Sequence, residues 1–123
     1  MGYSVLIVDD EREASESLKM FFELKGFTVR LASSGREGVA AVRESTPDIV
    51  LLDLQMPGMD GWQTLQEMRE AVPTLRVAIV TGSVPDRGLE EMALKGGAVG
   101  IVTKPIKVDE LVPKIRAFIE GTA

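Results

Sequence analysis

The hydrophobic and polar positions of this chain separate into two kinds of segment that alternate. Five short runs are rich in β-branched and apolar residues, and three of them (VLIV, IVLL and VAIV) are continuously apolar. Continuous apolar runs of this length are typical of strands that are buried on both faces of a parallel sheet. We therefore predict strands over residues 3–8, 27–31, 48–52, 76–80 and 99–102.

The segments between these runs carry apolar residues at steps of three and four, which is the period of a helix that packs on one face. Ser34 stands three residues before Glu37, which is the spacing of a capping box, and Asp60 can cap the third helix. The pair Gly96–Gly97 is expected to end the fourth helix. Residues 56–59, Met-Pro-Gly-Met, are predicted to form a tight turn.

Five strand and helix units in succession predict an α/β fold. Such a chain forms a parallel sheet, and its continuously apolar strands indicate that helices cover both faces. The last helix has one apolar face, although Pro113 removes one of its hydrogen-bond donors. With 123 residues the chain has the size of one domain. We therefore predict a single doubly wound (βα)5 domain over residues 1–123, with a five-stranded parallel sheet.

Polar residues stand at the carboxyl ends of four of the predicted strands. The carboxyl ends of parallel strands meet at one edge of the sheet, and ligands of open α/β sheets bind outside this edge. We therefore expect these residues to converge on one shallow cleft, although they are far apart in sequence. They are Asp9, Asp10, Asp53, Thr81, Thr103, Lys104 and Pro105.

The residue types at this edge suit metal-assisted phosphoryl transfer. Three carboxylates in one place repel one another, and a cation relieves the repulsion. The chain has no Cys and no His, so oxygen ligands favour a hard cation, and Mg²⁺ best suits an open site that keeps water. Asp53 is the candidate nucleophile that would form an aspartyl phosphate, while Lys104 and Thr81 would contact the other phosphoryl oxygens.

Each of these residues also has an ordinary structural interpretation. Asp9 or Asp10 can cap a helix, and Asp53 can be a loop carboxylate. Thr81 can belong to a turn, and Lys104 can be a solvated charge. These interpretations do not require all five residues to stand at the ends of strands one, three, four and five, whereas a shared site does.

The composition excludes several classes of function. Without His the chain cannot carry a phosphohistidine or a Ser-His or Cys-His catalytic pair, and without Cys it cannot form a disulfide. Its formal net charge of -5 disfavours non-specific binding to nucleic acid. No run approaches the roughly 18 apolar residues of a membrane span, and the N-terminus lacks a secretion signal. We therefore expect a cytoplasmic protein with no direct nucleic-acid or membrane partner.

Four motifs resemble those of response-regulator receiver domains, and the resemblance runs from about Ser4 to Ile119. The motifs are IVDDE at 7–11, LLDLQMPGMDG at 51–61, VTGS at 80–83 and VTKP at 102–105. Any one of them alone is weak, but their order and spacing together are specific. The resemblance implies a CheY-like, flavodoxin-like fold with strand order 2-1-3-4-5.

The resemblance also implies a phosphorylation-dependent signalling module of a two-component system or phosphorelay. Asp53 would accept a phosphoryl group from a phosphohistidine of a sensor histidine kinase or a histidine phosphotransfer protein. The module would not be an enzyme beyond its self-catalysed phosphoryl uptake and slow autodephosphorylation. Asp9, Asp10 and Asp53 would hold Mg²⁺ together with the backbone carbonyl of Gln55, and Lys104 would contact the phosphate.

The same resemblance implies how the module switches. Thr81 would move toward the phosphoryl group and change the face of helix four, strand five and helix five, which a downstream effector reads. Gln55 and Ser83 stand where the phosphoryl lifetime is tuned, and the peptide bond before Pro105 is commonly cis in the family. Ile101 departs from the pattern, because the family usually has Tyr or Phe there and isoleucine has no ring to turn inward.

Two other functions fit the same fold. One is an interaction domain that keeps the pocket but is never phosphorylated, and only an assay excludes it. The other is a Mg²⁺-dependent phosphatase with an aspartate nucleophile, which normally has a second aspartate where this chain has Gln55. The sequence leaves open the cognate kinase, the effector, the phosphoryl lifetime, dimerisation, and whether the domain stands alone.

Overall fold

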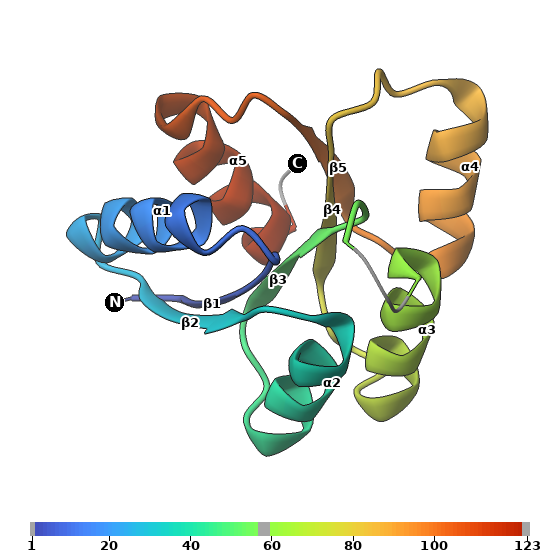
Figure 1. The fold of residues 1–123 in the computed structure, drawn as a ribbon, viewed down its shortest axis with the longest axis horizontal. Helices are drawn as coiled ribbons and strands as arrows, with labels where there is room; N and C mark the ends of the chain where they lie inside the picture. The colour runs from blue at the N-terminus through green and yellow to red at the C-terminus, as the bar shows by residue number, and fades with distance from the viewer. Residues whose placement is uncertain (1, 57–59, 122–123) are drawn as a thin grey trace.

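The computed structural model describes residues 2–56 and 60–121. Within them, five parallel strands form one sheet in the order β2-β1-β3-β4-β5 with five helices around it (Figure 1), which confirms the predicted fold. The elements are β1 (Ser4–Val8), α1 (Arg12–Leu24), β2 (Thr28–Ala32), α2 (Gly35–Glu44), β3 (Ile49–Asp53), α3 (Gly61–Ala71), β4 (Val77–Thr81), α4 (Arg87–Gly96), β5 (Gly100–Thr103) and α5 (Val108–Glu120). The turn predicted at 56–59 falls on 57–59, which lie outside the described residues.

Strands β2 to β5 each begin and end one residue later than the apolar runs predicted. β3 ends at Asp53 and β4 ends at Thr81. Backbone pairing continues past the last apolar residue, since Asp53 pairs in register with Val80, and Thr81 pairs with Thr103. Asp53 and Thr81 are therefore the last residues of strands rather than the first residues of loops.

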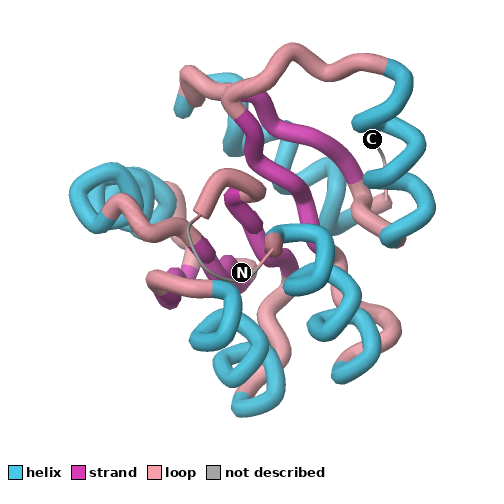
Figure 2. Tube along the Cα trace, turned by 45° about the vertical axis from the view of Figure 1, so that its right-hand side comes forward, coloured by secondary structure: helices cyan, strands magenta, loops and turns pink. Residues whose placement is uncertain are grey.

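Two apolar cores lie on opposite faces of the sheet. Alternate strand residues point to opposite faces, so Leu51 packs with Phe22 of α1 and Ile115 of α5, whereas Leu52 packs with Leu65 of α3. Figure 2 shows the strands enclosed between the helices. Burial on both faces explains why the central strands are continuously apolar. Among the described residues, no helix is long and apolar enough to cross a membrane.

The predicted helix caps are present, with one difference. Ser34 Oγ accepts a hydrogen bond from the Glu37 N–H at 3.1 Å, and Asp60 Oδ1 accepts one from the Trp62 N–H at 2.8 Å. The Glu37 carboxylate, however, accepts from the N–H and the hydroxyl of Ser33, both at 3.0 Å, and does not reach back to the cap residue. The hydrogen bond from the Ser33 N–H, assisted by the hydroxyl, lowers the pKa of Glu37.

Replacing Ser34 with Ala is expected to lower the free energy of unfolding by about 1 kcal/mol, because α2 loses its N-terminal cap. Urea denaturation measures this change. Ser17→Ala serves as the control, since Ser17 is an exposed residue within α1, and its effect should stay within about 0.5 kcal/mol. Equal effects of the two substitutions would show that the cap contributes nothing particular.

Candidate functional site

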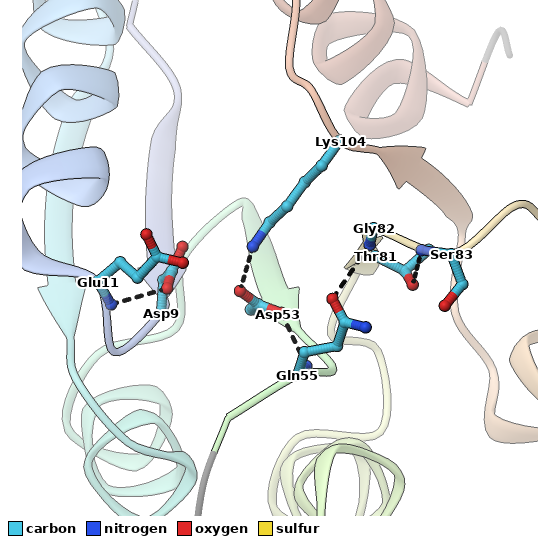
Figure 3. A network of polar contacts seen from close by, with 8 residues as sticks. All are labelled: Asp9, Glu11, Asp53, Gln55, Thr81, Gly82, Ser83 and Lys104. Carbon is cyan, nitrogen blue, oxygen red and sulfur yellow. Dashed lines mark hydrogen bonds and ion pairs between the residues drawn. The ribbon is translucent and has the colours of Figure 1, made fainter.

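The carboxyl edge of the sheet gathers side chains from the ends of β1, β3, β4 and β5. Figure 3 shows Asp53 at the centre, with Lys104 reaching toward it from the end of β5 and Asp9 on the side of β1. Gln55 and Thr81 lie on the other side. The parallel sheet thus brings together residues that are up to 95 positions apart in sequence, since Asp9 and Lys104 lie at opposite ends of the set (104 minus 9).

Both carboxylate oxygens of Asp53 are engaged. Oδ2 accepts a hydrogen bond from Lys104 Nζ at 2.7 Å, and Oδ1 accepts one from the Gln55 N–H at 2.8 Å. Only 2% of the Asp53 side chain is exposed. The carboxylate of Asp53, the last residue of β3, is therefore buried at this edge of the sheet. Its negative charge is balanced by one lysine.

Lys104 supplies that balancing charge. Burial by itself lowers the pKa of its ammonium, but the hydrogen bond to Asp53 and the charge of Asp53 outweigh burial and raise the pKa. The ammonium therefore stays protonated at neutral pH. It is 28% exposed, so it can follow a charge that develops beside Asp53. The peptide bond between Lys104 and Pro105 is cis, as the family resemblance implied.

Asp9 faces the same centre from β1. Its Oδ1 accepts a hydrogen bond from the Glu11 N–H at 2.9 Å. Burial raises the pKa of Asp9, and the negative charge of Asp53 raises it further. Asp9 and Asp53 are therefore close enough to repel, whereas Asp10 is exposed.

The predicted trio of carboxylates is not assembled for a metal ion. Across residues 2–56 and 60–121, no group of three or more acidic side chains is placed to hold one. The donor chemistry of the Asp9 and Asp53 pair still fits Mg²⁺, which commonly takes one or two carboxylates and keeps several waters. A cation between the two would relieve the repulsion that contributes to the raised pKa of Asp9.

The loop after β4 lies across the site from Lys104. Thr81 is 3% exposed, and its Oγ1 accepts a hydrogen bond from the Ser83 N–H at 3.1 Å. Gln55 Oε1 accepts one from the Gly82 N–H at 3.3 Å. Figure 3 shows the Gln55 amide between Asp53 and Gly82. The loops that follow β3 and β4 are thus joined by a side chain.

Comparison with known proteins decides the family. The family described as response regulator receiver domain matches residues 5–116. The chain belongs to the response-regulator receiver family.

Curated relatives of this receiver are longer than the chain. It is 33% identical over 123 residues to response regulator MprA of Mycolicibacterium vanbaalenii, and the match covers 99% of this chain and 52% of that protein. It is 35% identical over 121 residues to the probable transcriptional regulatory protein TcrX of Mycobacterium tuberculosis, covering 97% of this chain and 50% of that protein. The receiver therefore spans about half the length of the curated relatives it matches.

Solved structures share the fold over nearly the whole receiver. The CheY-like receiver domain protein of Methanospirillum hungatei has a TM-score of 0.91 at 26% identity, covering 99% of this chain and 97% of that one. A two-component response regulator of the LuxR family from Aurantimonas sp. has a TM-score of 0.89 at 31% identity, covering 98% and 87%. Fold and family therefore agree.

Ile101 takes its place in the receiver as a packing residue. It is partly buried against the core that contains Ile79 and Ala93, and its carbonyl accepts a hydrogen bond from Lys114 Nζ at 3.0 Å. The sequence predicted this departure from the usual aromatic. The sequence did not predict the hydrogen bond between Gln55 and Gly82. Its one trace in the sequence is the glycine at position 82, where a Cβ would lie 3.2 Å from Gln55 Oε1.

Proposed function

We propose that this receiver accepts a phosphoryl group on Asp53 from a phosphohistidine of a sensor histidine kinase or a histidine phosphotransfer protein. The observation that supports the proposal most is the buried Asp53 carboxylate, held at the end of β3 between the Lys104 ammonium and the Gln55 N–H. A carboxylate fixed beside a cation has the arrangement that phosphoryl transfer requires, namely positioning together with charge stabilisation.

In the proposed step, a carboxylate oxygen of Asp53 attacks the phosphorus atom as the N–P bond of the donor breaks. The histidine nitrogen leaves with the electron pair, and the O–P bond forms on Asp53. Lys104 then pairs with a phosphoryl oxygen, which replaces the carboxylate oxygen as its partner. The 123 residues of this chain contain no His, so the donor histidine lies outside them.

We propose that Asp9, Asp10 and Asp53, with the backbone carbonyl of Gln55, hold Mg²⁺ in the working receiver. Bound Mg²⁺ supplies positive charge for the phosphoryl oxygens during transfer. Burial raises the pKa of Asp9, and the negative charge of Asp53 raises it further, so a cation between the two carboxylates would be stabilising. Asp10 is exposed and follows Asp9 in sequence, and in the working receiver its carboxylate would join the other two.

The proposed output is a change of the face formed by α4, β5 and α5. The Thr81 hydroxyl, which now accepts from the Ser83 N–H, would donate to a phosphoryl oxygen and draw the loop that leads into α4. On α4 the side chains of Met92 and Leu94 are exposed, so a downstream effector or a second copy of the receiver has apolar groups to bind there.

Intact mass measured after incubation with acetyl phosphate tests the proposal. A single phosphoryl adduct is expected when Mg²⁺ is present, and none when a chelator removes it. If no adduct accumulates, binding of beryllofluoride with Mg²⁺ indicates an aspartyl phosphate that is hydrolysed quickly. Absence of both an adduct and beryllofluoride binding would contradict the proposal and favour an interaction domain that is never phosphorylated.

A further inference from the structure

The first two backbone N–H groups of the loop after β4 are both occupied by side-chain oxygens. The Gly82 N–H donates to Gln55 Oε1 at 3.3 Å, and the Ser83 N–H donates to Thr81 Oγ1 at 3.1 Å. Gln55, which makes the first of these bonds, belongs to the loop that follows β3 and Asp53. The loop after β4 is therefore hydrogen-bonded to the loop that follows the candidate acceptor.

Backbone N–H groups at the edge of the sheet are suitable donors for a phosphoryl oxygen, since they need no rearrangement and carry partial positive charge. In Figure 3 the Gln55 amide lies between the Asp53 carboxylate and Gly82. The amide oxygen of Gln55 therefore occupies the Gly82 N–H. An oxygen of an aspartyl phosphate would accept a hydrogen bond from the same N–H group.

We propose that the Gln55 side chain is a positioning residue that latches the loop after β4 in the resting receiver. Its amide oxygen holds the Gly82 N–H until a phosphoryl oxygen on Asp53 displaces it. This inference rests on the proposed function of Asp53 as the phosphoacceptor. It concerns the side chain of Gln55 alone and is independent of the backbone carbonyl proposed as a Mg²⁺ ligand.

The surroundings of the latch allow it to open. Gln55 and Gly82 are both exposed, and so are residues 83–88 that follow, so few packed contacts oppose a movement of this loop. Gly82 permits the close approach of the amide, because a Cβ at that position would lie 3.2 Å from Gln55 Oε1. The latch is thus a surface hydrogen bond whose strength sets the resting position of the loop.

The first test compares the wild type with Gln55→Ala in a beryllofluoride titration at fixed Mg²⁺, followed by the fluorescence of Trp62, the one tryptophan. Beryllofluoride should bind the variant about threefold to tenfold more tightly, because the wild type must first break one hydrogen bond. Hydrogen exchange of the Gly82 amide in the free protein should be faster in the variant. Gln63→Ala is the control, because the Gln63 amide donates to Glu67 on α3, and it should change neither quantity.

Gly82→Ala provides a second route to the same contact, because the added Cβ presses on the amide oxygen of Gln55. It should tighten beryllofluoride binding in the wild type and have no further effect in Gln55→Ala, as expected for two changes that act on one interaction. Beryllofluoride binding that is equal or weaker in Gln55→Ala, or unchanged exchange at Gly82, would overturn the latch alone. A wild type that binds no beryllofluoride would overturn the proposed function, and the latch with it.

Discussion

Replacing Asp53 with Asn is expected to abolish phosphoryl uptake and to leave the receiver folded. An amide in place of the carboxylate provides no nucleophilic oxygen of comparable strength, so the acceptor is lost. Its oxygen can still accept one of the two hydrogen bonds that Lys104 Nζ and the Gln55 N–H donate to Asp53. Removing the buried charge also ends its repulsion with Asp9, so the free energy of unfolding should change by no more than about 1 kcal/mol.

Intact mass after incubation with acetyl phosphate and Mg²⁺ measures the uptake, and urea denaturation measures the stability. Asp109→Asn is the matched control, because Asp109 is an exposed carboxylate in the first turn of α5 and should label like the wild type. An adduct on Asp53→Asn would place the phosphoacceptor at another residue. Unfolding of Asp53→Asn would show that the ion pair with Lys104 is required for the fold.

Replacing Lys104 with Met is expected to slow phosphoryl uptake by about 100-fold, because the transferring group loses its one lysine contact. The same substitution leaves the Asp53 carboxylate, which is 2% exposed, without its partner. An uncompensated buried charge should lower the free energy of unfolding by about 2 kcal/mol at neutral pH, less than for a fully buried pair because Lys104 is 28% exposed. The rate of adduct formation and urea denaturation measure the two effects.

A double-mutant cycle separates the charge effect from lost packing. In the Asp53→Asn background, Lys104→Met should cost little stability, because no buried charge is left uncompensated. Lys107→Met is the control for uptake: its ammonium is 76% exposed and lies 4.0 Å from Glu110 Oε2. An equal loss of stability from Lys104→Met in both backgrounds would mean that the aliphatic stem of Lys104 matters, and not its pairing with Asp53.

The apolar runs located the strands of this receiver and the last residue of β1, but not the last residues of β2 to β5. Apolar character ends at Leu52 and Val80, whereas backbone pairing continues through Asp53 and Thr81. A strand boundary depends on hydrogen bonds to its neighbours, which local composition does not encode. Asp53, the candidate acceptor, is the last residue of β3, and its side chain is 2% exposed.

The sequence also predicted which residues would meet, because parallel topology fixes the edge at which all carboxyl ends lie. Asp53 and Lys104, which are 51 positions apart, form the expected contact. The sequence did not predict the directions in which the side chains point. Nothing in the residue type of Gln55 indicates that its amide turns to Gly82, and two adjacent aspartates do not reveal that Asp9 turns toward the site while Asp10 is exposed.

The backbone around the acceptor is fixed on both sides by the sheet. The Leu54 N–H donates to the Val80 carbonyl at 3.0 Å, and the Lys104 N–H donates to the Thr81 carbonyl at 2.8 Å. These hydrogen bonds join the carboxyl ends of β3, β4 and β5 to one another. If Asp53 is phosphorylated as proposed, we expect the exposed residues 82–88 to move rather than the strand ends. These residues lead into α4, so α4 is the element that we expect to be displaced.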